Sequence, residues 1–165
     1  MVELQRLRSD HAAAVLAFEA ANRAWFAASV TDRGDAYFEQ FSERYRLLLA
    51  EQDAGTCAFH VLLGDDGAVV GRFNLYDLAN GAADVGYRVA EQVTGLGVAT
   101  AGVLALCRLA TERHGLHRLR AKTRDDNVAS RRVLEKAGFV AVGPIEVAGH
   151  PGTSYECALD VSWDR

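Results

Sequence analysis

Two glycines stand where a strand-like segment gives way to a helix-like one, and this arrangement suits the binding of phosphate. Gly95 and Gly97 follow the segment 83–89 within the run Gln92-Val93-Thr94-Gly95-Leu96-Gly97-Val98-Ala99. Glycine lets a ligand approach the backbone without meeting a Cβ. The first turn of a helix also leaves N–H groups free at the positive end of its dipole. The run therefore predicts an anion-binding turn, although plain strand-to-helix connections also contain such glycines.

The common nucleotide-binding patterns fit this run poorly. A P-loop needs Gly-Lys followed by Ser or Thr, which does not occur in this run. A dinucleotide-binding pattern needs a third Gly or Ala where Thr100 stands. It also needs an acidic residue about 20 residues further on, and residues 114–118 in that place contain none.

A third pattern fits the spacing. Gln-x-x-Gly-x-Gly at 92–97 is followed by a helix, a strand and the run Asn127-x-x-Ser130-x-x-Val133-Leu134-Glu135-Lys136-x-Gly138-Phe139. With these two motifs in this order, the chain resembles the GNAT family of acyl-CoA N-acyltransferases over nearly its whole length. The runs 21–26 and 32–38 also look like the RimJ/RimL-like branch, which acetylates the N-terminal alanine of ribosomal proteins.

The resemblance implies that the chain binds acetyl-CoA (coenzyme A). Backbone N–H groups of the glycine run would contact its pyrophosphate, and groups of the preceding strand would contact its pantetheine amides. The predicted cofactor-binding residues are Tyr87, Arg88, Val89, Gln92, Thr94, Gly95, Leu96, Gly97, Val98, Ala99, Thr100, Asn127 and Ser130. Alternation in a strand explains Tyr87 and Val89 equally well, and helix capping explains Asn127.

Transfer of an acetyl group from a thioester to an amine needs a proton donor for the departing thiolate. Many members of the family place a tyrosine at the position of Leu134. Ser130 is the predicted substitute, because it shares a helical face with Val133 and Leu134 while residues 131, 132, 135 and 136 turn outward. A hydroxyl that only bonds backbone at a helix start is the alternative.

The amine needs a proton acceptor, and Asp84 on the central strand is the candidate. A solvated aspartate near a turn is the alternative. The N-terminal acetyltransferase branch carries a glutamate near the place where Gly149 stands, with Glu146 and His150 close by, so this role stays open.

Residues 22–38 would cover the acceptor side of the cleft in this family. The predicted substrate-binding residues are Asn22, Arg23, Trp25, Phe26 and Tyr37. The alternative is that the rings only pack in the core and that the polar residues only cap helices or face solvent. The branch favours a protein or peptide N-terminus attacked directly in a ternary complex, since no Cys or Ser stands with a His as an activated nucleophile. A small-molecule amine N-acetyltransferase and a CoA-binding sensor without turnover remain as other interpretations.

Composition agrees with one domain spanning residues 1–165. With 50% hydrophobic residues the chain can bury a sizeable core, and its net charge of -4 argues against a general nucleic-acid binder. The N-terminus lacks the apolar stretch of a signal peptide, and no run approaches the roughly 18 apolar residues of a membrane span. We therefore expect a cytoplasmic monomer or homodimer with no membrane partner. Cys57, Cys107 and Cys157 are interpreted as reduced core thiols, and no metal site is predicted.

The elements that position these residues predict an α/β (α+β) fold, with about four helices and a mixed sheet of about six or seven strands. Turns at 64–67 and 80–81 join an antiparallel meander. A strand–helix–strand unit then requires a parallel crossover, and in the GNAT fold the two parallel strands splay at the cofactor cleft. Asp35 is a predicted N-cap, and Gly115 and Gly138 end helices. The predicted strands are 2–7, 57–63, 68–76, 83–89, 119–123, 139–142 and 154–159, and the predicted helices are 10–22, 35–54, 96–114 and 127–137.

Overall fold

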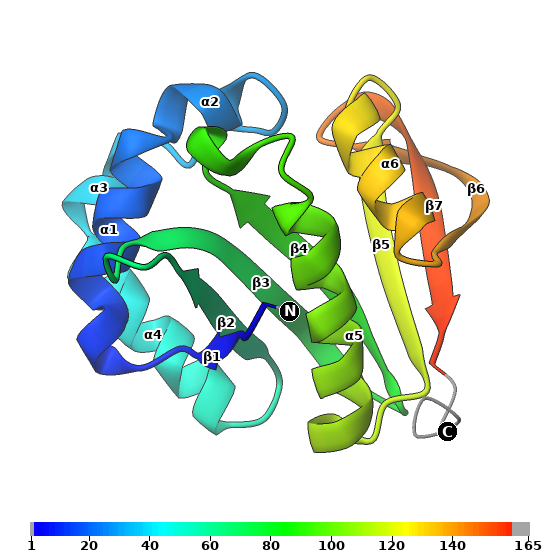
Figure 1. Ribbon diagram of the computed structural model, residues 1–165, viewed down its shortest axis with the longest axis horizontal. Coiled ribbons are helices and arrows are strands. Elements are labelled where there is room, and N and C mark those ends of the chain that lie inside the picture. The colour runs from blue at the N-terminus through cyan, green and yellow to red at the C-terminus, as the bar shows by residue number, and fades with distance from the viewer. Residues whose placement is uncertain (1, 160–165) are drawn as a thin grey trace.

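The computed structural model describes residues 2–159, which form one mixed sheet with helices on both faces (Figure 1). The strand order is β1-β2-β3-β4-β5-β7-β6. Neighbouring strands are antiparallel except β4 and β5, which are parallel. This confirms the predicted α/β fold with an antiparallel meander followed by a parallel pair. The strands are β1 (Gln5–Arg6), β2 (Ala58–Leu63), β3 (Val69–Ala79), β4 (Ala82–Val89), β5 (Arg118–Arg124), β6 (Val140–Val147) and β7 (His150–Ala158).

The described part of the chain contains six α-helices, where about four were predicted. The additional helix, α2, follows directly after Asn22, and the predicted helix 35–54 is interrupted at Gln40. Asp35 is not an N-cap, because Gly34 holds that position with φ 88° and the Asp35 carboxylate accepts a bond from Arg23 instead. The helices are α1 (Ala12–Ala21), α2 (Arg23–Ala27), α3 (Asp35–Glu39), α4 (Phe41–Asp53), α5 (Val98–His114) and α6 (Val128–Lys136).

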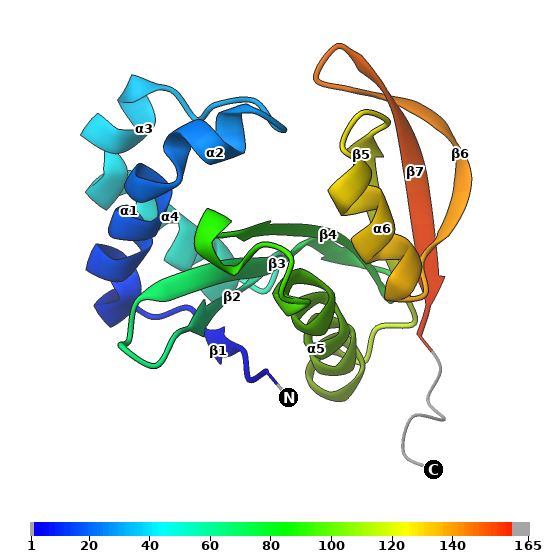
Figure 2. The same ribbon diagram turned by 45° about the horizontal axis from the view of Figure 1, so that its top comes forward.

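Helices α1–α4 cover one face of β1–β4, and α5 covers the other face (Figure 2). On the α5 face, Gly102 packs directly on the ring of Phe73, where an added Cβ would lie only 2.1 Å from Cζ. The Phe73 ring is in turn stacked on Tyr87, with ring centroids 6.0 Å apart. The sheet is therefore buried on both sides at its centre.

The turn between β3 and β4 follows the predicted pattern. Asn80 and Gly81 both have positive φ, 54° and 75°, as a two-residue type I′ turn requires. Such a turn matches the right-handed twist of the two strands that it joins. The predicted glycines after α5 and α6 also have positive φ, 59° at Gly115 and 96° at Gly138.

Strands β4 and β5 separate after a short paired stretch. They pair only at Ala82–Arg118, Ala83–Leu119 and Asp84–Arg120. Beyond this point β4 keeps its pairing with β3, and β5 keeps its pairing with β7. The facing edges are therefore unpaired from Val85 and Ala121 onward, which confirms the predicted splay.

The last two strands are longer than predicted. A two-residue turn at Ala148 and Gly149, with φ of 50° and 80°, joins β6 and β7 into one hairpin. Pro144 and Pro151 lie within these strands and weaken their sequence signal, because proline lacks an N–H for the ladder. Pro144 is tolerated because β6 is an edge strand.

Candidate functional site

A cleft of about 670 Å³ lies where β4 and β5 separate. One wall is formed by β4 and the start of α5, and the opposite wall by β5, α6 and the β6–β7 turn. Residues at and after α2 close one end. Of the predicted site residues, those that line the cleft are Trp25, Phe26, Tyr87, Arg88, Val89, Thr94, Gly95, Gly97, Val98, Ala99, Thr100, Asn127 and Ser130.

The glycine turn has the geometry of an anion site. Gly95 and Gly97 have φ of 80° and 76°, and a Cβ added to either would meet no atom within 4 Å. Gly97 is the N-cap of α5, so the N–H groups of Val98, Ala99 and Thr100 have no carbonyl partner within the helix. These N–H groups and the dipole of a 17-residue helix attract negative charge. Gln92 and Leu96, which were also predicted to bind the cofactor, do not line the cleft.

Backbone groups of β4 also face the cleft. The Ala90 N–H donates to the Val70 carbonyl, which makes Val70–Ala90 a hydrogen-bonded pair. Because such pairs alternate along an antiparallel ladder, the backbone of Arg88 is engaged by β3 while that of Tyr87 and Val89 points toward β5. With no strand there, these groups can bind the amides of an extended ligand.

Cationic side chains surround the same cleft. Lys122 and Arg124 extend from β5, and Arg132 and Lys136 from α6. Arg132 and Lys136 are exposed on α6, as predicted, and they also line the cleft, which was not predicted. Their spacing of four residues, which places them on one side of a helix, was the available signal. Together with the glycine turn, Arg132 and Lys136 suit a polyanionic ligand.

Ser130 lies at the first turn of α6 with its hydroxyl toward β4. Asn127 is the N-cap, as predicted, and its Oδ1 accepts a bond from the Ser130 N–H at 3.2 Å. The Ser130 Oγ is 3.1 Å from the Tyr87 hydroxyl. Burial raises the pKa of Tyr87, while the contact with Ser130 opposes that rise. From the sequence only the backbone of Tyr87 was predicted to bind, and no local signal indicates this hydroxyl pair.

Asp84 lies at the last paired rung before the strands separate. Its carboxylate accepts a bond from Arg120 Nε at 2.8 Å, and about half of its side chain is exposed. Asp84 alternates with Gly86 and Arg88 and so shares the face of β4 that α1–α4 cover. It does not line the cleft itself.

Three of the predicted acceptor contacts lie away from the cleft walls. Tyr37 is buried against Phe38 and Phe41. Asn22 is also buried, and it donates to the Phe18 carbonyl and accepts from the Glu91 N–H. Arg23 bonds Asp32 and Asp35. Tyr37, Asn22 and Arg23 therefore bind other parts of the protein, whereas Trp25 and Phe26 line the cleft.

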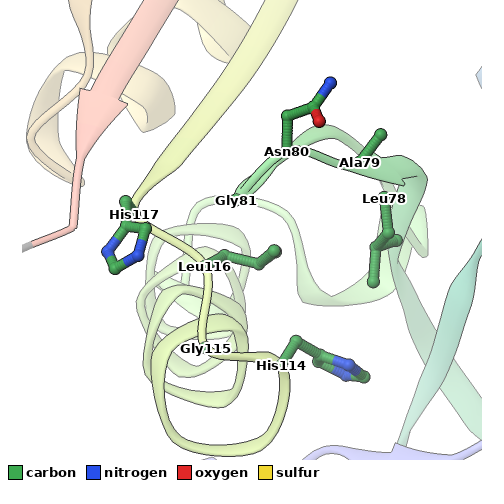
Figure 3. Close-up of a pocket in the computed structure, with 8 residues that line it drawn as sticks. All are labelled: Leu78, Ala79, Asn80, Gly81, His114, Gly115, Leu116 and His117. Atoms are coloured by element: carbon green, nitrogen blue, oxygen red, sulfur yellow. The ribbon is translucent and has the colours of Figure 1, made fainter.

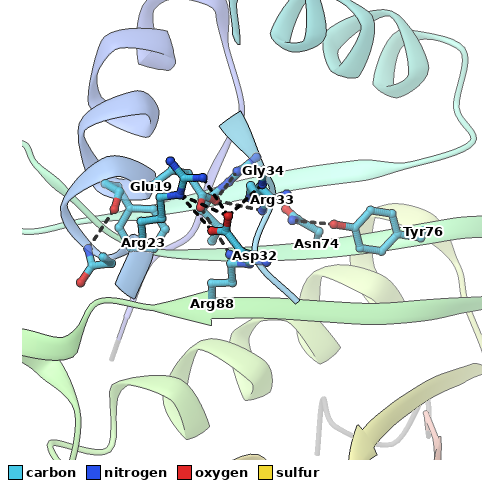
Figure 4. Close-up of polar contacts among 11 residues, drawn as sticks. Glu19, Arg23, Asp32, Arg33, Gly34, Asn74, Tyr76 and Arg88 are labelled. Carbon is cyan, nitrogen blue, oxygen red and sulfur yellow. Dashed lines mark hydrogen bonds and ion pairs between the residues drawn. The ribbon is translucent and has the colours of Figure 1, made fainter. Parts of the chain in front are cut away.

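A buried ionic cluster links α1 to β3 and β4 (Figure 4). Glu19 is only 1% exposed, and its carboxylate accepts from Arg33 and Arg72 at 2.9 Å and from Arg88 at 3.5 Å. Burial alone would raise the pKa of Glu19, but the hydrogen bond and charge of Arg33, with the charges of Arg72 and Arg88, hold it below its ordinary value. Nothing in an alanine-rich helix marks this glutamate as an ionic centre.

A second cavity of about 550 Å³ lies between the β3–β4 turn and the C-terminal end of α5 (Figure 3). The side chains of His114 and His117 point to different sides of it. Among residues 2–159, no three His, Cys, Asp or Glu side chains are grouped to hold a metal. No helix in this range is long and apolar enough to cross a membrane. The splayed cleft is therefore the better candidate for chemistry.

Comparison with known proteins identifies the fold. The model of the acetyltransferase (GNAT) domain matches residues 2–140. The chain belongs to the GNAT acetyltransferase family. A probable N-acetyltransferase of Bacillus subtilis (strain 168), YjcK, is 30% identical over 131 residues, which cover 75% of this GNAT chain and 72% of the relative.

Solved GNAT structures agree over nearly the whole chain. RimJ of Mycobacterium smegmatis, in complex with CoA-disulfide, has a TM-score of 0.83 and 25% identity, covering 94% of this chain and 80% of RimJ. The ribosomal-protein-S5-alanine acetyltransferase of Vibrio fischeri has a TM-score of 0.88 and 20% identity, covering 96% and 93%. This GNAT chain is therefore an enzyme that transfers acetyl from acetyl-CoA to an amine.

The residues of the cleft fit acetyl-CoA. The open glycine turn, the free N–H groups of α5 and the cations of α6 suit its phosphates. The unpaired edge of β4 suits its amide-bearing arm. We therefore assign the separated ends of β4 and β5 as the place where this GNAT enzyme would hold its cofactor.

Proposed function

We propose that this GNAT enzyme acetylates the α-amino group of a protein or peptide N-terminus, by direct attack in a ternary complex. The runs 21–26 and 32–38, which resemble the RimJ/RimL-like branch, support this class of acceptor, and RimJ itself is 25% identical to this chain. The fold shared with a ribosomal-protein-S5-alanine acetyltransferase is consistent with it.

The main support for the proposal is the charge of the cleft. Among the described residues that line it there are five arginines and lysines and no carboxylate or imidazole. The cleft walls therefore offer no strong base to an incoming ammonium group. An α-amino group has a pKa of about 7.7–8.0, against about 10.4 for a lysine amine, so its neutral fraction at neutral pH is roughly a hundredfold or more higher. An α-amine therefore depends less than a lysine amine on a base in the cleft to become a neutral nucleophile.

Proton transfer is assigned to three side chains. Acetyl-CoA supplies the activated acyl group as a thioester. A C–N bond forms and the C–S bond breaks, while one proton leaves nitrogen and one must reach sulfur. Ser130, backed by Tyr87, is the proposed donor toward sulfur. Asp84, on the acceptor face of β4, is the proposed proton acceptor, and it acts through water because it does not line the cleft.

A panel of amines tests this function. The enzyme and acetyl-CoA are incubated with peptides that begin with alanine or serine, with the same peptides N-terminally blocked but carrying a lysine, and with spermidine. Mass spectrometry and release of free CoA report the product. We expect acetylation of the free N-termini. Transfer only to spermidine would indicate a small-molecule amine acetyltransferase, and binding of acetyl-CoA without transfer to any amine would indicate a sensor.

A further inference from the structure

Arg88 offers its side chain, and not its backbone, to the acceptor end of the cleft. Its backbone groups are hydrogen-bonded to β3, because hydrogen-bonded pairs alternate along the β3–β4 ladder and Val70–Ala90 is such a pair. Its side chain is 20% exposed, and the guanidinium lies 4.8 Å from the centroid of the Phe26 ring. Both residues line the cleft, beside Trp25.

The cluster around Arg88 contains more positive than negative charge. Arg33 and Arg72 share one oxygen of Glu19, and Arg88 reaches the other only at 3.5 Å. When the neighbouring group of Arg23, Asp32 and Asp35 is included, four guanidinium groups face three carboxylates. The buried Nε of Arg72 has no hydrogen-bond partner. An uncompensated charge in a poorly hydrated site is costly unless an opposite charge joins it.

This charge is separate from the phosphate-binding side of the cleft. The side chain of Arg88 lies on the face of β4 that α1–α4 cover, whereas the glycine turn begins α5 on the opposite face. Arg88 is thus the cleft-lining member of an electropositive cluster beside the aromatic residues of α2.

From this arrangement we infer that Arg88 binds a carboxylate of the acceptor, so that the preferred acceptor is an α-amine with an acidic group close to it. The inference rests on the proposed function and names the acceptor class for that site. A guanidinium binds a carboxylate through two parallel hydrogen bonds, and the Phe26 ring holds the guanidinium plane in place. The same charge repels polyamines, which carry further ammonium groups.

The carboxylate can come from an acidic side chain near a peptide N-terminus or from the α-carboxylate of a free amino acid. The values of kcat/KM are therefore measured for Ala-Asp-Ala-Gly-amide and for its neutral partner Ala-Asn-Ala-Gly-amide. A second pair of peptides carries Asp or Asn at position three instead of position two. A third pair compares free alanine with alaninamide. We expect at least one acid-bearing acceptor to exceed its neutral partner by roughly tenfold, the value of one charge-assisted hydrogen bond. Titration calorimetry of the peptide pairs gives the same ratio without turnover.

Two variants connect this preference to Arg88. Arg88→Gln should bring the acid-to-neutral ratio close to one, and Arg88→Lys should keep part of it. Arg46→Gln removes an exposed positive charge on α4, outside the lining of the cleft, and should leave the ratio unchanged. Thermal melting checks that each variant is folded. If Arg88→Gln does not fold, the acid-to-neutral ratios of the wild-type enzyme and of Arg88→Lys test the inference instead.

The outcomes separate the two proposals. Transfer to α-amines at equal rates for acidic and neutral partners would overturn the inference and leave the proposed function standing. An acid preference that Arg88→Gln retains, or that Arg46→Gln loses equally, would also overturn it. No transfer to any α-amine would overturn the proposed function and the inference together.

Discussion

The hydroxyl oxygens of Tyr87 and Ser130 lie 3.1 Å apart and join the two walls of the cleft, one from β4 and the other from α6. Burial raises the pKa of Tyr87, so its phenol stays protonated at neutral pH. A protonated phenol that donates to Ser130 leaves the serine proton free to face the cleft. The pair thus offers a proton donor in a chain that has leucine at position 134, where the family resemblance implies a tyrosine.

We predict that Ser130→Ala and Tyr87→Phe each lower kcat by roughly a hundredfold, the lower range for general acid catalysis, with little change in the KM for acetyl-CoA. Steady-state kinetics with a peptide acceptor measure both values. Because the two hydroxyls act as one unit, the double variant should be no slower than the slower single variant. Losses that multiply in the double variant would show that the hydroxyls act independently.

Acetyl-CoA should raise the melting temperature of the wild-type enzyme and fail to do so for Gly97→Glu. At a hundredfold excess over its dissociation constant, a ligand that binds only the folded state adds roughly 2.7 kcal/mol of stability. Gly67→Glu is the matched control, since Gly67 also has positive φ, 82°, and open space around it but lies in the β2–β3 turn. An equal rise in melting temperature with acetyl-CoA in both variants would show that the glycine turn is not part of the cofactor site.

Asp84→Asn should lower kcat/KM for the acceptor by roughly a hundredfold, because it removes the proposed proton acceptor. Arg120→Gln breaks the same ion pair but keeps the carboxylate, and it should retain most of the activity. Rate measurements on both variants separate the two roles of Asp84. Equal losses would indicate that the pair only fixes the point at which β4 and β5 separate.

Glu19→Gln should destabilise the fold by about 3 kcal/mol at pH 7, because it leaves three guanidinium groups without their shared carboxylate. The lowered pKa of Glu19 means that its contribution is present above the ordinary value of 4.5 and is lost as pH falls below it. Urea unfolding at pH 7 and pH 4 should show the difference from wild type shrinking at the lower pH. Glu43→Gln, in an exposed pair with Arg46, should have no measurable effect.

The stability of the wild-type enzyme should fall as pH decreases from 6.5 to 4, partly through His60. Burial lowers the pKa of His60 to about 4 from 6.5, against the opposing bond to the Phe73 carbonyl. The folded state thus favours the neutral ring, and protonation of the unfolded chain in this window removes up to about 3 kcal/mol. Unfolding curves of His60→Gln should show a shallower dependence on pH.

Features determined by local sequence could be predicted. The Asn80–Gly81 turn, the Asn127 cap and the glycines that end α5 and α6 depend on residues a few positions apart, and the structure has each of them. The lengths of β6 and β7 could not be predicted, because proline weakens a strand pattern unless the strand is known to be at an edge.

The details of the site depended on contacts between distant segments. Glu19 meets Arg72 and Arg88 only because α1 packs over β3 and β4. Tyr87 reaches Ser130 only because β5 leaves the edge of β4 free and α6 closes the space. Residue type alone also could not separate Trp25, which is exposed and lines the cleft, from Tyr37, which is buried in the core.

Gly102 lies about one turn into α5, the helix whose first N–H groups form the anion-binding turn. Since no side chain separates α5 from Phe73, and Phe73 stacks on Tyr87, the helix, the ring and the phenol are in direct packing contact, one on the next. The spacing between the phosphate-binding turn and the hydroxyl pair is thereby set by apolar packing beneath the cleft. A single methyl group added at position 102 would change that spacing without touching any residue that contacts a ligand.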